Sequence, residues 1–394
     1  MINFQTAEKA LKSFYLSVIA EQLNTKINPL LSKIEQTSSD VAGKEIVKLC
    51  TYGVNGGVGA GSETGTLPTS GENSYEQFRL TLKNFFGKLE ISDKALRASQ
   101  TDGGAFVNLL NAEMDGLLKA SKMNFGRMLY GDGSGKLATV VAKETSDTST
   151  NDYIKVDDVS KFVLGMTIDI ATTSGVIAAA GKNKRIIGID RANKVIRISV
   201  CPTTAFAANS TVYVQNSKDA ELTGLEAIFG NSETLYGLTR ANFDFLKPYV
   251  KSSCGKLTVD AMQSAIDQAE IASGGEINFI TASYDVRRNY VATVTAKATN
   301  VDVMNVDGGY KAISYSGIPM VADRYVPAGT MYMLNTDDFK LHQLCDWRWI
   351  EGEGGSVLHQ LAGTPNYYAT LVKYADLLCE RPSGQVKISG ITAE

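Results

Sequence analysis

The sequence predicts an α+β fold with more than one domain, and three observations lead to this class. Residues 105–130 have the apolar spacing of one long helix, whereas most other apolar runs are short and alternate with polar residues as strands do. Helices and strands are mixed without strict β–α–β alternation. The 394 residues, 44% hydrophobic and 21% charged, are enough for two or three domains that each bury a core.

Composition excludes several functional classes. The net charge is −3 and no long basic block occurs, which argues against sequence-specific nucleic-acid binding. The five cysteines are scattered and never form a C-x-x-C pair, so we expect buried thiols in a reducing compartment, with neither a disulfide framework nor a thiolate zinc site. No apolar run approaches the ~20 residues needed to span a membrane, and the N-terminal segment does not resemble a secretory signal. We therefore expect a protein of the cytoplasm.

The first segment is predicted to be an N-terminal arm. Phe4, Leu11 and Phe14 recur at helical spacing and give this segment one apolar face, and Asn3 or Thr6 can cap the helix. The pattern weakens near residue 29 and ends in the polar run 36–40.

Two strands of a long projecting hairpin are predicted next, at residues 46–54 and 75–86. The stretch between them is rich in glycine and cannot support a core. In the second strand Phe78, Leu80 and Leu82 alternate with Arg79 and Lys83, so we expect an apolar face that needs cover and a charged face opposite it. A free two-stranded ribbon is only marginally stable, and a neighbouring copy of the chain is the simplest surface to cover it.

The middle of the chain changes character twice. The long helix is predicted over residues 105–130, ending at Gly131. Residues 140–217 then contain short β-branched runs at 167–170, 185–189, 195–200 and 211–214, separated by turn signals, which indicates a small inserted all-β module.

The C-terminal part alternates between the two kinds of element. Helices are predicted over 258–272 and 283–297, with a short helical turn at 336–339. Strands are predicted at 277–281, 310–315, 318–323, 331–334, 344–350 and 367–379, with Ser316-Gly317 as a tight hairpin turn.

Signatures of an enzyme or a cofactor site fail in detail. The run Gly131–Leu137 lacks a P-loop's first glycine and final Ser or Thr, and it follows a helix. The only two histidines, His342 and His359, are expected at the surface or an interface. Loop carboxylates such as Asp157-Asp158 or Glu351 with Glu353 are expected to be solvated, as is the basic turn 182–185; the run 305–308 is expected to be a turn. We predict no catalytic residues, no cofactor and no metal.

Four motifs, in order, resemble the HK97-fold major capsid proteins of tailed bacteriophages. Tyr130-Gly131-Asp132-Gly133-Ser134-Gly135 is similar to the exit of that family's spine helix, and Ser283-Tyr284-Asp285-Val286-Arg287-Arg288 to a capped helix of its axial domain. Residues 315–321, followed by 327–330, resemble its Gly-hydrophobic-Pro hairpin and the next strand. Residues 375–382 resemble the closing run that ends in Arg-Pro.

The resemblance implies a division of the chain into six parts. These are an N-terminal arm (1–44), an extended hairpin loop or E-loop (45–92), the peripheral domain with its spine helix (93–139), an inserted β domain (140–217), the axial domain (218–343), and long strands of the peripheral domain that return to the axial domain (344–394).

The function implied is that of a structural protein that forms hexamers and pentamers of an icosahedral head around double-stranded DNA, in a virion assembled in the bacterial cytoplasm. A separate scaffolding protein and a portal are the implied partners, with no membrane contact. Some family members join a lysine of the extended loop to a neighbouring asparagine, but residues 53–74 contain no lysine, so we expect no cross-link. The candidate subunit-contact residues are Phe4, Leu11, Phe14, Gly59, Leu67, Pro68, Tyr75, Phe78, Arg79, Leu80 and Lys83.

Two alternatives remain open at the level of the sequence. An encapsulin-like cellular compartment would share the architecture and enclose protein cargo. A glycan-binding surface protein would use the β module at 140–217 as its binding site.

Overall fold

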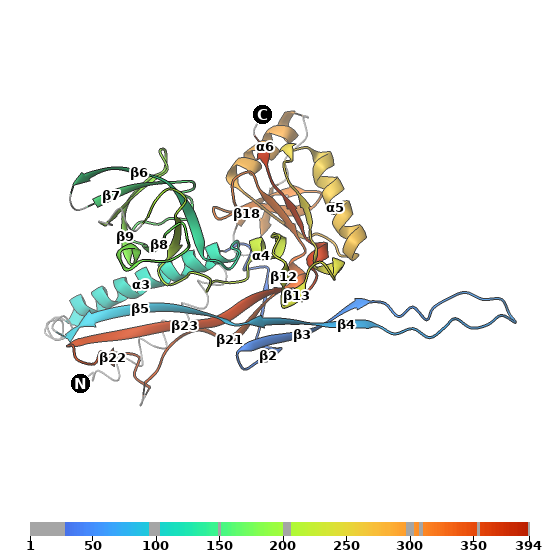
Figure 1. The fold of residues 1–394 in the computed structure, drawn as a ribbon, viewed down its shortest axis with the longest axis horizontal. Helices are drawn as coiled ribbons and strands as arrows, with labels where there is room; N and C mark the ends of the chain where they lie inside the picture. Colours follow the sequence, from blue (N-terminus) through green and yellow to red (C-terminus); the bar gives the residue numbers. More distant parts are fainter. Residues whose placement is uncertain are drawn as a thin grey trace.

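The structure is a computed structural model of the chain and describes residues 28–93, 103–148, 151–199, 206–296, 303–306, 310–352 and 355–392. The predicted N-terminal helix, with Phe4, Leu11 and Phe14, lies outside the described residues, as does Cys201. Figure 1 shows two lobes side by side above a long sheet, and a thin hairpin that extends beyond the body on one side. The chain is rich in strands with few helices, which confirms the α+β class.

A long sheet forms the base of the body. Its strands are β1 (Glu35–Thr37), β21 (Phe339–Trp349), β23 (Asn366–Cys379), β22 (His359–Gln360) and β5 (Lys83–Ser92). β5 and β21 both pair antiparallel with β23, whereas β1 joins β21 in parallel. Helix α3 (Gly103–Met128) packs on the sheet, where the rings of Phe85 and Phe125 meet edge-on with centroids 5.7 Å apart.

One lobe is a closed six-stranded barrel. Its strands, in the order in which they pair, are β10 (Val195–Ser199), β7 (Asn151–Val156), β6 (Lys136–Thr148), β11 (Thr211–Val214), β8 (Thr167–Ala171) and β9 (Lys184–Asp190). A short 3₁₀ turn, η1 (Ala179–Gly181), precedes β9. Alternate strand residues such as Ile154 and Ile196 point inward, and Phe162 from a connecting loop fills the same core. The first barrel strand begins at Lys136, four residues before the start of the β module that the sequence predicts at 140–217.

The other lobe is a seven-stranded mixed sheet with two helices. The strands, in order, are β14 (Tyr249–Lys251), β24 (Val386–Ile388), β20 (Met331–Leu334), β16 (Phe279–Ala282), β19 (Ile318–Ala322), β18 (Tyr310–Tyr315) and β17 (Val303–Val306). The helices are α5 (Val259–Ser273) and α6 (Tyr284–Ala296). Thr258 caps α5 by accepting a hydrogen bond from the backbone N–H of Ala261, and the apolar face of α5 packs on the sheet through Met262 and Ile266.

Several short elements complete the fold. They are α4 (Leu225–Phe229), β12 (Thr234–Leu235), β13 (Leu238–Thr239), η3 (Asp244–Leu246), η4 (Thr336–Asp338), η6 (Pro382–Gly384), and the parallel pair β15 (Gly255–Lys256) and β25 (Ile391–Thr392). No helix among the described residues is long and apolar enough to cross a membrane.

The projecting hairpin consists of β3 (Glu45–Gly53) and β4 (Ser74–Thr81), with β2 (Val41–Ala42) beside β3 at its base. After β4 the chain continues through Leu82 directly into β5, so the predicted strand 75–86 is two strands in two different sheets. The hairpin, which we call the arm with residues 54–73 as its tip, is thereby fixed to the base of the body (Figure 1).

Two expectations about single residues are wrong. His342 is fully buried: it lies on β21, which β1 covers, and its Nδ1 donates a hydrogen bond to the Ser39 carbonyl at 3.0 Å. Among the four described cysteines only Cys379 is buried, because the strands and loops that carry the other three each leave one side partly open to solvent.

Candidate functional site: surfaces open to contact by a second copy

The tip of the arm exposes apolar side chains that no other described residue covers. The exposed fractions of Val54, Val58 and Leu67 are 91%, 88% and 90%. Gly59 and Pro68 are exposed beside them. No Lys or Arg occurs between residues 48 and 79, so the tip carries only the negative charges of its glutamates. Apolar side chains on a thin ribbon are typical of a surface that another molecule covers.

The base of the arm is packed in the opposite way. The ring of Phe78 lies 5.4 Å from that of Tyr236 and 6.0 Å from that of Phe245, and Phe78 is 1% exposed. Leu80 and Leu82 are also buried in the same core. The expectation that these three residues form an open face for a neighbour is therefore wrong. The physical reason is that residues 235–246, far away in sequence, fold over this face.

The outer side of the base does remain open. Leu49 and Tyr75 are exposed on it. Tyr52 lies on the side of Phe78, where its ring stacks on Phe245 with centroids 5.2 Å apart, and it remains 45% exposed. Sequence reasoning named Tyr75 and missed Leu49 and Tyr52. The two residues lie three apart on β3, so strand alternation places them on opposite faces and could not have marked both as one exposed set.

The two cations predicted to contact a neighbour differ in exposure. Arg79 is exposed and its guanidinium donates to Gln77 Oε1 at 2.9 Å. Lys83 is half-buried and near the buried Asp376, the pKa of which burial raises to about 6. Contact of either cation with a second copy stays a prediction.

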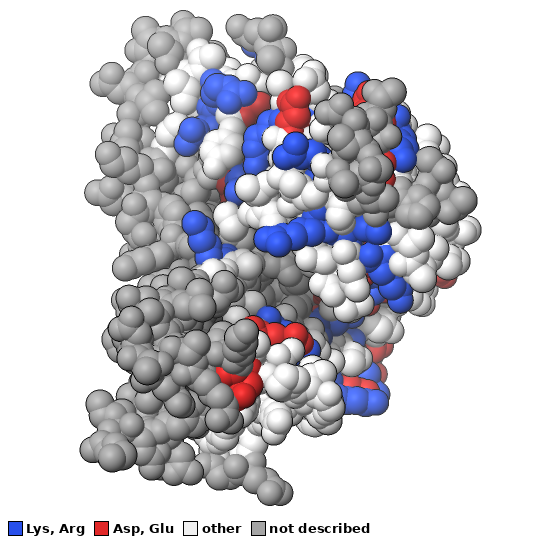
Figure 2. All heavy atoms as spheres, turned by 90° about the vertical axis from the view of Figure 1, so that its left-hand side faces the viewer, with Lys and Arg blue, Asp and Glu red and all other residues white. Residues whose placement is uncertain are grey.

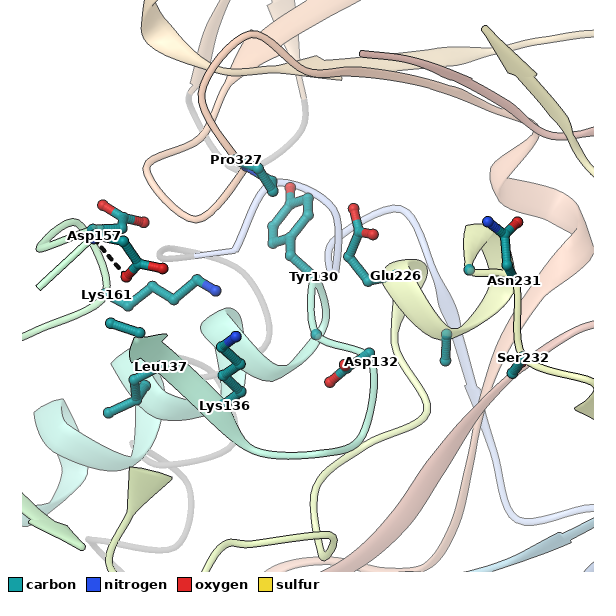
Figure 3. Close-up of a pocket in the computed structure, with 15 residues that line it drawn as sticks. Tyr130, Asp132, Lys136, Leu137, Asp157, Lys161, Glu226, Asn231, Ser232 and Pro327 are labelled. Atoms are coloured by element: carbon teal, nitrogen blue, oxygen red, sulfur yellow. Dashed lines mark hydrogen bonds between the residues drawn. The ribbon is translucent and has the colours of Figure 1, made fainter. Parts of the chain in front are cut away.

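A cleft of about 610 Å³ lies where α3 ends, between the barrel, α4 and the loop at Pro327 (Figure 3). Its charged groups are largely engaged with the protein itself. Asp157 accepts hydrogen bonds from the backbone of Thr139 and of Asp158, both at 2.8 Å. Glu226 binds Lys387 Nζ at 2.6 Å and also accepts a hydrogen bond from the Tyr332 hydroxyl.

Lys161 extends into this cleft, and burial lowers its pKa. Among the described residues no group of three or more His, Cys, Asp or Glu could hold a metal ion. Asp157 is exposed and Asp158 partly so, as expected for loop carboxylates, and both serve local turns. The cleft thus resembles a joint between structural units, with Asp157, Asp158 and Glu226 held by contacts within the subunit.

The glycine-rich run after α3 has a structural role in the same joint. Glu221 N–H donates to the Gly133 carbonyl at 3.3 Å, so residues 133–135 run beside the chain that leaves the barrel. Gly135 has φ +78°, and a Cβ there would lie 2.3 Å from the Ser217 carbonyl oxygen. Arg127, at the end of α3, forms a buried two-pronged ion pair with Glu221. These contacts attach the barrel to the helix.

Comparison with solved structures identifies the fold of this chain. No family model and no curated protein matches the chain. A chain of the cyanophage A-1(L) capsid matches with 13% sequence identity and a TM-score of 0.58, covering 95% of this chain and 92% of that one. The capsid of Myoviridae phage XM1 matches with 10% identity and a TM-score of 0.45, covering 93% and 92%. An encapsulin from Synechococcus elongatus matches with 12% identity and a TM-score of 0.31, covering 43% and 58%.

The likeness to the cyanophage chain extends over almost the whole sequence. It confirms the capsid-protein fold that the four sequence motifs resemble.

Proposed function

We propose that this chain, with the fold of a phage capsid protein, is the major capsid subunit of a tailed bacteriophage and assembles into hexamers and pentamers of an icosahedral shell around double-stranded DNA. The arm carries the proposal, because it leaves Val54, Val58 and Leu67 uncovered within the subunit. A second copy that receives the arm would bury these side chains, and each fully buried one contributes about 1.5–3 kcal/mol.

In this proposal each part of the subunit corresponds to one part of the capsid fold. Residues 1–44 are the N-terminal arm and 45–92 the extended loop; 93–139 with 344–394 form the peripheral domain, 218–343 the axial domain and 140–217 the inserted domain. The packing of α3 on the long sheet and the separate cores of the two lobes support this division. A shell closes through many modest interfaces of this kind because their free energies add by multivalency.

The proposed partners follow from the charge of the chain and from its proposed role in the shell. A net charge of −3 favours a container wall that does not hold packaged DNA tightly. A separate scaffolding protein and a portal would complete the head in the bacterial cytoplasm. The cyanophage chain of the same fold is a capsid protein, and the carboxylates of the cleft are held in contacts within the subunit, so we propose no enzymatic activity.

The test is assembly of the purified chain with and without a shortened arm. We expect closed shells by sedimentation and electron microscopy at high concentration, with the scaffolding protein added where needed. Replacing residues 59–72 with an Asn-Gly turn should leave thermal unfolding of the subunit unchanged and abolish shells. Monomer under every assembly condition would contradict the proposal. Shells that contain protein cargo and no DNA in the native source would favour an encapsulin-like compartment, and glycan binding by residues 140–217 would favour a surface protein.

A further inference from the structure

Charge is divided unevenly between the barrel and the rest of the chain. Residues 136–214 contain ten Lys and Arg against seven Asp and Glu, whereas the remainder contains 29 against 35. Figure 2 shows the side of the molecule opposite the arm, where Lys and Arg side chains gather over the barrel. The barrel is therefore a cationic unit on an anionic subunit.

The cations occupy the outer face of three adjacent strands, β9, β10 and β7. Ile154, Ile196 and Ile198 on these strands point into the barrel core. Their neighbours Lys155 and Arg197 therefore point outward, since strand residues alternate between faces. Arg185 on β9 is exposed as well. We call this the basic barrel face.

A glycine keeps this face flat. Gly188 pairs with Arg197 across β9 and β10, and a Cβ at Gly188 would lie 3.2 Å from Arg197 Nε. The guanidinium can therefore lie against the strand, where its Nε is buried with no hydrogen-bond partner among the described residues.

The opposite side of the molecule carries an acidic helix. No Lys or Arg occurs between residues 256 and 287. Asp260, Asp267 and Glu270 on α5 are exposed, and Ile271 beside them is 80% exposed. We call this the acidic α5 face.

Two of these carboxylates have no counter-charge on their own helix. Asp267 and Glu270 lie toward the C-terminal end of α5, where the helix dipole disfavours negative charge. Asp267 accepts a hydrogen bond from the neutral Gln263 at 2.7 Å, and none of the ion pairs among the described residues involves Asp267 or Glu270. Arg381 reaches the helix end, but it donates to the Ser273 carbonyl at 3.3 Å. A partner outside the subunit is the simplest recipient of this charge.

The direction of the arm indicates on which side of the subunit the adjacent copy lies. The arm extends beyond the body on the side of α5, and the barrel lies on the other side (Figure 1). If the proposed function holds, the copy that receives the arm lies beyond α5 and presents its opposite side, because a head-to-tail contact joins two different faces. That opposite side is the one that carries the barrel.

We infer that the acidic α5 face of one subunit contacts the basic barrel face of the adjacent copy. The dimensions agree: the ten residue steps of helix from Asp260 to Glu270 span ~15 Å, and the three strands are spread over ~10 Å. Ile271 and the partly exposed Ile187 on β9 supply an apolar centre within the charged rim. Complementary charge would then select this register among the possible side-by-side contacts.

The test is a charge exchange in the full chain. Asp267→Lys with Glu270→Lys, and separately Lys155→Glu with Arg185→Glu, should each lower particle yield about tenfold or more through like-charge repulsion. The four changes together restore opposite charges and should recover most of the yield. Glu233→Lys, at an exposed position on the loop before β12, is the control and should assemble normally. Thermal unfolding of each unassembled variant checks that it folds.

The outcomes separate this inference from the proposed function. If the wild-type chain forms no shell, the proposed function fails. If shells form and the α5 reversal does not lower yield, or the combined variant assembles no better than the worse parent, only this contact is overturned. An effect of the barrel reversal alone would mean that the basic face binds another anion, such as nucleic acid, and would overturn it too.

A second measurement needs no substitution. A zero-length carbodiimide reagent joins a lysine to a carboxylate that it already touches. Peptide mass spectrometry of wild-type particles should find Lys155 joined to Asp267 or Glu270, and unassembled subunits should lack that product. Its absence from intact particles would contradict the inference.

Discussion

Truncating one buried and one exposed side chain of the arm is expected to separate folding from assembly. Phe78 is 1% exposed and packs against the rings of Tyr236 and Phe245, whereas Leu67 at the tip is 90% exposed. Removal of a buried phenylalanine side chain costs about 3–5 kcal/mol, because both its transfer free energy and a cavity are involved. That is a large part of the ~5–15 kcal/mol that typically stabilises a domain.

The same change at the tip should leave the fold untouched. Leu67→Ser removes no contact of a buried core, so the free energy of unfolding should change by less than ~0.5 kcal/mol. Particle yield should nevertheless fall, because the variant loses the apolar contact that we propose Leu67 makes with the next copy. Leu67→Met keeps an apolar side chain of similar volume and serves as the matched control.

Urea unfolding of the unassembled subunit and gradient sedimentation of assembled particles measure the two effects. We expect Phe78→Ala to lower the unfolding midpoint and Leu67→Ser to lower only the yield of particles. The reasoning is refuted if Leu67→Ser destabilises the subunit by more than about 1 kcal/mol, on the scale of a lost core contact. It is also refuted if Phe78→Ala leaves stability unchanged and blocks assembly.

Three further predictions follow from buried charges and from the arm's sequence. Burial raises the pKa of Asp376 from 3.8 to about 6, so the folded subunit binds an extra proton between these values. The subunit therefore loses up to ~3 kcal/mol of stability as pH rises through that window. Asp376→Asn should flatten this dependence in urea unfolding at pH 4–7, and an unchanged slope would contradict it. Glu221→Gln should cost about 3–5 kcal/mol because it leaves Arg127 buried without its counter-charge, and a loss below ~1 kcal/mol would show the pair to be dispensable. Denaturing gels of mature particles should show a single monomer band, since residues 53–74 contain no lysine, and a ladder of multimers would disprove this.

Local sequence determined the regular elements, because the relevant interactions span only a few residues. Helix α5 begins after its Thr258 cap and follows its apolar spacing, within one residue of the expected bounds. The β18–β19 hairpin turns at Ser316 and Gly317, whose φ angles of 50° and 81° are those that a tight two-residue hairpin needs. The long helix, the short barrel strands and the absence of lysine at the arm tip were likewise visible in the sequence.

Pairings between distant segments could not be read in this way. β1 joins β21 in parallel across about three hundred residues and so buries His342, which the sequence placed at a surface. Lys373 in the apolar strand β23 is buried because Asp346 and Gln343 on β21 meet its Nζ at 2.7 and 2.8 Å. Neither partner is local to it.

The arm shows both what local sequence predicts and what it leaves undecided. Alternation identified Phe78, Leu80 and Leu82 as an apolar face, since the period of a strand is set by its own backbone. Whether that face meets a neighbour or its own chain depended on residues 235–246, whose position is set by the packing of α4 and the base of the sheet. The sequence by itself determined that this apolar face must be covered. Only the tertiary structure decided that the same subunit covers the base of the arm and leaves its tip open, because burial depends on contacts between segments far apart in the chain.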